Sequence, residues 1–473
     1  MTRFIGREVE IAALRSLLDR VTAAIGEPRP GQCVLMRGRR RIGKSALAEE
    51  FVSRTGLPYL YFTAARASEE QELRQLMDDV AASELADRAV FAETPPANWN
   101  GALQLLADIV PDDSPSVLVI DEVPYLMERV DAFEGMLQRA WDRFLSRKPV
   151  LLILIGSDLS MMEALNSYER PFHQRGTEMV VKPLNPAEIQ EMLGLDAKSA
   201  FDAALVTGGL PLVCAEWRPG TSLWEYLHEA LMNPVSALLV SGERMLAAEF
   251  PGQAMAREVL EAIGSGERTF VNIARAAGGI SHSTLTRAVE VLTAKGIVVS
   301  DVPLSTRPSK ERRYRISDAY LRFWLYFLQP HIPEIERRRG DLTVRRVAAG
   351  WSSWRGRAVE PLVREALARL APDGRLPQAA AIGSYWTRSN DVEIDIVGAD
   401  RAPVAKELHF IGSIKWLESP FDNHDLQKLI QHRARLTDNP LPLIVASRSG
   451  ASCGGMATVY GPDDLVTAWR YPR

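Results

Sequence analysis

The chain has 473 residues, of which 46% are hydrophobic and 25% charged, and its net charge is −4. This ordinary composition excludes a wholly disordered chain, a fibrous protein and a protein that is basic throughout, and the longest apolar runs are too short to cross a bilayer. At ~100–200 residues per domain, we expect roughly two to four domains. No apolar stretch follows the charged start, and the three cysteines lie far apart. We therefore expect a cytoplasmic protein without a signal peptide, membrane partner, disulfide framework or zinc site.

About the first 180 residues alternate short apolar runs with helix-length amphipathic stretches. Such runs are typical of buried parallel strands in an α/β sheet. The expected strands are Cys33–Met36, Leu57–Phe62, Val117–Ile120, Val150–Ile155 and Met179–Val181.

A phosphate-binding pattern, G-x-x-x-x-G-K-[ST], follows the first of these strands as Gly38-Arg39-Arg40-Arg41-Ile42-Gly43-Lys44-Ser45. A helix-forming run begins at Ala46, so the segment has the strand–loop–helix context of a P-loop. Glycines let backbone N–H groups close on phosphate oxygens, and the helix N-terminus adds a positive dipole. We expect this loop to bind ATP, with Lys44 at the β- and γ-phosphates and Ser45 on Mg²⁺.

The expected strand at residues 117–120 ends in Asp121 and Glu122. Downstream of a P-loop, Asp121 is expected to hold the metal's water shell, and Glu122 to orient or deprotonate the attacking water. Ser157 follows the next strand and is expected to bind the γ-phosphate or the water. Asp158 beside it is the alternative, unless it caps the helix that follows.

Two arginines, Arg170 and Arg175, come next. An arginine at the γ-phosphate neutralises charge in the transition state. A surface role is the alternative for each of them.

Five segments occur in a specific order: Phe4–Glu10, the P-loop, Ile120–Glu122, Gly156-Ser157 and Gly208–Pro211. In this combination, about the first 235 residues resemble the archaeal-type DEXX-box ATPases of the AAA+/STAND group of P-loop ATPases. The resemblance implies that Arg7 and Glu8 lie near the nucleotide, and that Gly209-Leu210-Pro211 packs near its base or phosphates. It also favours Arg175 over Arg170 as the catalytic arginine.

A helical segment follows the expected ATPase core at 1–183. Asn185 and Pro186 have the residue types of a helix N-cap and first helical position, and the helical pattern continues to about residue 240. We expect residues 184–240 to form a helical lid.

Residues 241–316 have the pattern of a winged helix-turn-helix, with three helices followed by a strand and a returning strand. In such a module the start of the third helix contacts base edges, and a basic wing grips phosphates. The candidate DNA contacts are Thr284, Arg287, Arg307, Lys310, Arg312 and Arg313. A packing or protein-contact role is the alternative.

The stretch from Arg307 to Arg357 is a basic belt, with 13 Lys and Arg against 5 Asp and Glu, a local net charge of +8. The rest of the chain then carries −12. The belt favours a polyanion as partner, and a solvated helix face with internal ion pairs is the alternative.

Residues 317–473 are expected to form a linker helix and a C-terminal domain. Ile316–Trp324 resembles the segment that joins these ATPases to a domain similar to PD-(D/E)XK nucleases. That resemblance implies a Mg²⁺ site formed by Glu360 on a helix, Asp395 on a strand and Lys415 on the next strand.

This nuclease-like site departs from the family pattern at Ser413, where a second strand carboxylate is expected. Serine is a poor anionic ligand, so Mg²⁺ affinity should fall. Glu393, on the same strand face as Asp395, can compensate, whereas Glu418 lies past the strand and is a worse candidate.

Together these features predict an α/β multidomain protein: a parallel-sheet P-loop ATPase with a helical lid, a winged helix-turn-helix and an α/β nuclease-like domain. We predict a switch that hydrolyses ATP with Mg²⁺ and couples nucleotide state to DNA or partner binding, with a degenerate nuclease-like domain. One alternative is an ATP-gated metal-dependent DNA nuclease. Another is a non-catalytic regulatory or interaction protein, and a protein partner or homo-oligomer stays open.

Overall fold

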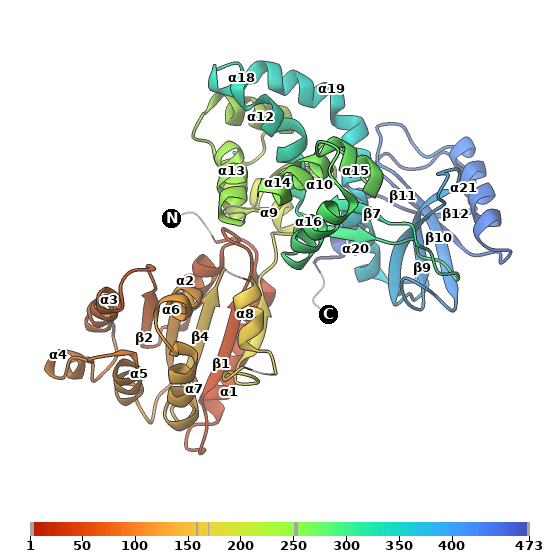
Figure 1. Ribbon diagram of the computed structural model, residues 1–473. Helices are drawn as coiled ribbons and strands as arrows, with labels where there is room; N and C mark the ends of the chain where they lie inside the picture. The colour runs from red at the N-terminus through yellow and green to blue at the C-terminus, as the bar shows by residue number, and fades with distance from the viewer. Residues whose placement is uncertain (1–3, 158, 169, 250–253, 471–473) are drawn as a thin grey trace. The chain divides into compact units, whose positions relative to one another are not determined.

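The computed structural model describes residues 4–157, 159–168, 170–249 and 254–470. It contains two compact units, Met1–Pro183 and Leu184–Arg473 (Figure 1). Within the described ranges, no helix combines the length and the apolar character that crossing a membrane requires.

The first unit is built on a five-stranded parallel sheet with the order β2-β3-β4-β1-β5 (Figure 1). The central strand β4 and its neighbour β3 are buried along their whole length, which explains their unbroken apolar sequence. The five predicted strands are confirmed, as β1 (Gln32–Arg37), β2 (Tyr59–Thr63), β3 (Ser116–Asp121), β4 (Val150–Gly156) and β5 (Thr177–Val180).

Helices pack around this sheet and bury an aromatic centre in which the ring of Trp99 meets Phe133 edge-on at 5.3 Å. The carboxyl ends of β1, β3 and β4 are neighbours in the sheet, so the loops that follow them meet at one edge. The helices are α1 (Glu8–Ala23), α2 (Lys44–Thr55), α3 (Glu69–Ala82), α4 (Val90–Glu93), α5 (Trp99–Asp108), α6 (Val123–Arg129), α7 (Phe133–Arg143) and α8 (Leu159–Leu165).

The second unit begins with helices. The predicted helix start is confirmed, because the Asn185 side chain accepts from the backbone N–H of Ala187 and of Glu188, and Pro186 is the first helical residue. These helices are α9 (Pro186–Leu193), α10 (Ala197–Thr207), α11 (Pro211–Ala215), α12 (Leu223–Met232) and α13 (Ala237–Glu249).

Three helices and an antiparallel strand pair follow, as the sequence predicts for this segment. They are α14 (Ala254–Gly264), α15 (Phe270–Ala276), α16 (His282–Ala294), β6 (Val298–Asp301) and β7 (Arg313–Ile316). The connection between the two strands is anchored at its start: the N–H of Leu304 donates to Ser384 O at 2.8 Å, and its side chain joins the C-terminal core.

The C-terminal part is a mixed five-stranded sheet of order β12-β11-β10-β9-β8, antiparallel from β8 to β10 and parallel from β10 to β12 (Figure 1). Its strands are β8 (Ala381–Trp386), β9 (Glu393–Ala399), β10 (Leu408–Lys415), β11 (Leu443–Ser447) and β12 (Ala457–Tyr460). The helices are α17 (Ala319–Phe323), α18 (Ile332–Glu336), α19 (Gly340–Ala358), α20 (Glu360–Leu370), α21 (Asn423–Leu436) and α22 (Pro462–Thr467). A π-helical turn, Trp324–Leu328, and a 3₁₀ turn, Gln329–His331, join α17 to α18.

Candidate nucleotide site and associated surfaces

The loop between β1 and α2 has a backbone that favours glycine. Gly43 has a φ of 89° and Arg41 a φ of 65°, both in the left-handed region. A Cβ on Gly38 would lie 2.6 Å from the carbonyl oxygen of Val181. The two pattern glycines are therefore required by the loop's own geometry.

Lys44 lies inside this loop with 6% of its surface exposed. Its ammonium donates to the carbonyl oxygens of Gly38 at 2.8 Å and Arg39 at 3.0 Å. Burial lowers the pKa of Lys44, while the charges of Glu122 and Asp121 oppose that shift. The lysine is therefore held across the loop, with two carboxylates close enough to favour its charged form.

Ser45 and Asp121 are in contact at the carboxyl ends of the strands. The Ser45 hydroxyl donates to Asp121 Oδ2 at 2.6 Å, and the phenol of Tyr61 donates to the same oxygen at 3.1 Å. Burial and the Asp121 charge raise the pKa of Tyr61. Hydroxyl and carboxylate oxygens are the ligand types that suit Mg²⁺, so Ser45 and Asp121 fit this ion.

Tyr61 is a residue that sequence reasoning missed. It lies on β2 beside β3, paired in register with Val119. A tyrosine in a strand is ordinary, and only the order of the strands brings its hydroxyl to Asp121.

Glu122 has a left-handed backbone, φ 55°, directly before α6. Its carboxylate accepts a hydrogen bond from the Ser157 hydroxyl at 2.9 Å. Ser157 follows β4, which lies between β3 and β1 in the sheet, so its side chain is next to the residues that follow those two strands. Asp158, the alternative to Ser157, lies outside the described residues.

Arg7 holds the P-loop by hydrogen bonds to backbone carbonyl oxygens. It is 3% exposed, and its guanidinium donates to the carbonyl oxygens of Ile42, at 2.8 Å, and Lys182. Arg7 thus joins α1, the P-loop and the segment after β5 within the first unit.

Both candidate arginines are engaged with carboxylates. Arg175 donates to both oxygens of Asp142 at 2.8 Å, and Arg170 pairs with Glu134. A role at the γ-phosphate would require either arginine to leave its carboxylate. Pro211 starts α11 in the second unit, and its role at the nucleotide stays a prediction.

The nuclease-like residues gather between β9, β10 and α20. Asp395 Oδ2 accepts from the Ser413 hydroxyl at 2.9 Å and from the N–H of Ile414 at 2.8 Å. Burial and the charge of Glu360 raise the pKa of Asp395 to about 7. This carboxyl therefore loses its proton less readily than an exposed aspartate does.

The other residues of the predicted nuclease-like site form ion pairs. Lys415 pairs with Asp425, and Glu360 pairs with Arg364 at 3.3 Å. Glu393, the compensating candidate, pairs with Arg313. Throughout the described ranges, no three or more His, Cys, Asp or Glu side chains are grouped to hold a metal ion.

The candidate DNA contacts differ in their surroundings. Arg287, Arg307, Lys310 and Arg312 are exposed. Thr284 is half-buried, and its hydroxyl bonds to the Ser281 hydroxyl that caps α16. Arg313 is held by Glu393 and Asn390, with its guanidinium 4.5 Å from the Trp386 ring centre, so it is a packing residue in this structure.

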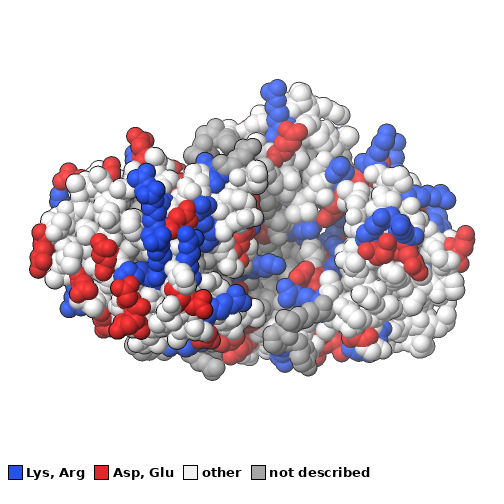
Figure 2. Space-filling view, turned by 90° about the horizontal axis from the view of Figure 1, so that it is seen from below, with Lys and Arg blue, Asp and Glu red and all other residues white. Residues whose placement is uncertain are grey.

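Ion pairs account for much of the basic belt. Six of its arginines pair with carboxylates: Arg313, Arg315, Arg339, Arg345, Arg346 and Arg355. On the face seen in Figure 2, basic and acidic side chains are likewise interspersed over much of the surface. Internal pairing, the alternative explanation of the belt, thus applies to a large part of it.

Two family models match the chain. Residues 4–203 match an ATPase domain found predominantly in Archaea. Residues 324–429 match a family of archaeal and bacterial proteins of unknown function. An uncharacterized protein of Methanocaldococcus jannaschii is 25% identical over 434 residues, which cover 90% of each chain.

Two solved structures match part of this chain. The Walker-type ATPase of Pyrococcus abyssi has a TM-score of 0.49 and 19% identity, and the match covers 68% of this chain and 97% of that one. The ORC2 protein of Aeropyrum pernix, solved with nucleotides, has a TM-score of 0.47 and 13% identity, with 73% and 96% covered.

Proposed function

We propose that the protein is a switch that binds and hydrolyses Mg-ATP at Gly38–Ser45, because residues 4–203 match an ATPase domain found predominantly in Archaea. The observation that carries this proposal is the meeting of two side-chain pairs at adjoining strand ends. Ser45 bonds to Asp121 at 2.6 Å, and Ser157 bonds to Glu122 at 2.9 Å.

Each residue of the site has a separate role. The loop N–H groups and Lys44 bind the phosphates, and Ser45 and Asp121 hold Mg²⁺, which supplies neutralisation of phosphate charge. Glu122 accepts a proton from the attacking water, and the Ser157 hydroxyl keeps that carboxylate oriented. Arg7 keeps the loop in its binding shape.

Lys44→Ala should weaken ATP binding by about 1.5–3 kcal/mol, roughly 10- to 150-fold, the usual size of a lost hydrogen bond to a charged group. Calorimetric titration with a non-hydrolysable ATP analogue measures it. Lys148→Ala is the matched control, because Lys148 precedes β4, at the opposite end of that strand from Ser157. Equal affinities of Lys44→Ala and the parent would rule out this nucleotide site.

The second unit contains the parts through which the proposed switch would bind DNA or a partner. We propose a helical lid at 184–240, a winged helix at 241–316 that binds DNA, and a linker with a nuclease-like domain at 317–473. What supports DNA binding is the set of exposed basic side chains at α16 and between β6 and β7: Arg287, Arg307, Lys310 and Arg312.

Replacing Arg307, Lys310 and Arg312 by Ala should weaken binding to all DNA sequences alike. Each lost phosphate contact lowers the slope of log affinity against log salt by ~0.9, so the slope should flatten by roughly two to three units. Fluorescence anisotropy over a salt series measures it. Arg345→Ala on α19 is the control, and an unchanged slope in the triple variant would assign the segment to packing.

We propose that the nuclease-like domain is degenerate and does not cleave DNA. Three contacts support this proposal. Ser413 stands where a carboxylate is expected and bonds to Asp395, Lys415 is paired with Asp425, and Glu393 is paired with Arg313. Binding a cation there would have to break these contacts.

A further inference from the structure

Two adjoining cavities in the second unit have several lining arginines in common. The larger has a volume of about 80 Å³ and the smaller of about 40 Å³. Both exceed the ~10–15 Å³ that a single water needs. Their shared lining is Arg268, Tyr314, Arg315, Arg322 and Arg357.

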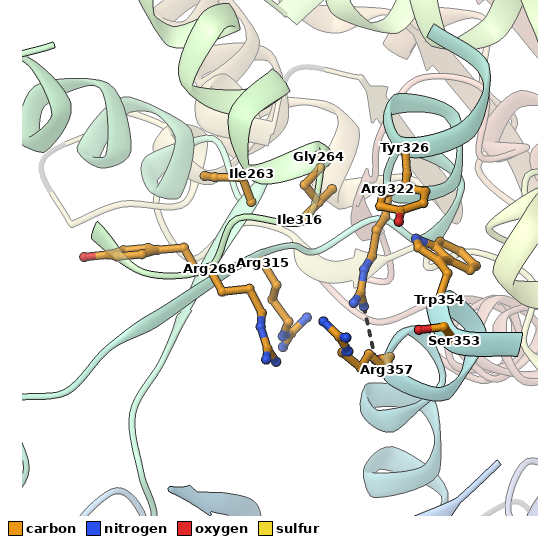
Figure 3. Close-up of a pocket in the computed structure, with 12 residues that line it drawn as sticks. Ile263, Gly264, Arg268, Arg315, Ile316, Arg322, Tyr326, Ser353, Trp354 and Arg357 are labelled. Atoms are coloured by element: carbon orange, nitrogen blue, oxygen red, sulfur yellow. Dashed lines mark hydrogen bonds between the residues drawn. The ribbon is translucent and has the colours of Figure 1, made fainter. Parts of the chain in front are cut away.

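Figure 3 shows the guanidinium groups of Arg268, Arg315, Arg322 and Arg357 turned toward one another. They come from the loop before α15, from β7, from α17 and from the end of α19. The larger cavity is closed on one side by the rings of Trp354 and Tyr326. Four guanidinium groups from four separate segments therefore converge on one small space.

Six arginines line the two cavities, and only half of them have a carboxylate partner. Arg313 pairs with Glu393, Arg315 with Asp301 at 2.7 Å, and Arg364 with Glu360 at 3.3 Å.

Arg268, Arg322 and Arg357 have no carboxylate partner within the part of the chain that the structure describes. Arg322 instead donates to the carbonyl oxygen of Arg357 at 3.4 Å. Three positive charges thus face the larger cavity, whose lining includes no carboxylate. The two carboxylates that line the smaller cavity, Asp301 and Glu360, are paired with Arg315 and Arg364.

Such a cluster is unfavourable by itself. Burial, together with the charges of the neighbouring arginines, lowers the pKa of Arg322 to about 10 against the attraction of Glu360. Burial and the charge of Arg313 also lower the pKa of Arg268. The charges of Glu360 and Glu393 and the face of the Trp354 ring, 5.9 Å from the Arg322 guanidinium, oppose these shifts only in part, and a bound anion would oppose them further.

We propose that this arginine pocket, formed by Arg268, Arg322 and Arg357, binds a phosphate group. Guanidinium donors match tetrahedral oxyanions in pairs, and arginine is the residue type suited to bidentate recognition of phosphate. The small volume suits a phosphate group rather than a whole nucleotide. The ligand is free phosphate, a small phosphorylated molecule or the terminal phosphate of a nucleic acid. The site is separate from the P-loop and does not depend on ATP hydrolysis.

The test is a thermal-stability titration of the full chain with inorganic phosphate, against chloride at equal ionic strength. All proteins carry Lys44→Ala, so that binding at the P-loop is suppressed. Phosphate should raise the melting temperature of this background, because a ligand that binds only the folded state stabilises it. In the double variant Arg268→Gln/Arg357→Gln, the apparent affinity for phosphate should fall roughly tenfold or more.

Two controls separate binding from structure. Arg345→Gln lies on the same helix as Arg357, is exposed and pairs with Asp341, and it should keep the phosphate effect. In chloride alone, the double variant should melt at the parent temperature or above, because two unbalanced charges are gone. An equal phosphate effect in double variant and parent, or a lower melting temperature of the double variant in chloride, would overturn the proposal.

The source of the phosphate is distinguished with two oligonucleotides that differ only in a 5′-phosphate or 5′-hydroxyl. Tighter binding of the phosphorylated form by the parent, lost in the double variant, assigns the pocket to a nucleic-acid end. Equal binding of both forms, with the effect of inorganic phosphate retained, assigns it to a small phosphorylated ligand.

Discussion

Glu122→Gln should lower kcat for ATP hydrolysis by about 10²–10⁴, the usual contribution of a positioned general base. The amide keeps the shape of the side chain and can still accept from the Ser157 hydroxyl, but it cannot take a proton from water. Affinity for ATP should stay within about twofold of the parent, because phosphate binding rests on the loop and Lys44. Single-turnover hydrolysis together with nucleotide titration measures both quantities.

Two further variants test whether Glu122 acts as a base. Ser157→Ala should lower kcat less than Glu122→Gln does, because it removes the group that orients the carboxylate and leaves the base itself. Glu128→Gln lies on α6, the helix that Glu122 directly precedes. Glu128 pairs with Arg66 at 3.0 Å, and this variant should hydrolyse ATP like the parent. A parental kcat in Glu122→Gln would assign the proton transfer to another group.

Asp202→Ala should destabilise the second unit by about 3–5 kcal/mol, the usual cost of removing one partner from a buried ion pair. Asp202 lies on α10 and accepts from Arg448 at 2.9 Å and from Arg355 at 3.3 Å. These three side chains are each less than 10% exposed, whereas Glu418, the other acid that contacts both arginines, is 70% exposed. Without Asp202, two buried guanidiniums would depend on a single solvent-facing carboxylate.

Calorimetry of the full chain measures this loss, and two variants define its cause. Glu365→Ala breaks an exposed pair with Arg369 and should cost less than about 1 kcal/mol. Replacing Asp202, Arg355 and Arg448 together by Leu, Met and Met should recover most of the stability, because no charge is left buried without a partner. A loss below 1 kcal/mol in Asp202→Ala would mean that water reaches the cluster.

The buried cluster also shows why α10 matters to the C-terminal sheet. Asp202 is next to Phe201, whose ring meets Trp416 at 5.1 Å and Trp469 at 6.1 Å. Arg448 additionally donates to the carbonyl oxygen of Lys198 on the same helix at 3.1 Å. A helix expected in the lid is thus a packing partner of the C-terminal domain, inside the second unit.

Much of the first unit follows from local sequence. Continuous apolar runs predict the strands, because a strand buried on both faces has no polar alternation. Gly38 and Gly43 predict the P-loop, since only glycine fits its close approach to Val181 and its left-handed turn. Asn185 and Pro186 predict the start of α9 because capping involves neighbours in the chain.

Contacts between polar side chains that lie far apart in the sequence were decided by tertiary structure alone. Tyr61 donates a hydrogen bond to Asp121 because β2 lies beside β3. Glu393 pairs with Arg313, 80 positions away in the sequence, because the fold brings β7 and β9 together. The partner of such a side chain depends on which residues the fold brings near it, and the periodicity of the sequence does not predict which residues those are. For the same reason the sequence shows a basic belt of net charge +8, while only the fold shows that Arg268, Arg322 and Arg357 line one cavity and have no ion-pair partner among the described residues.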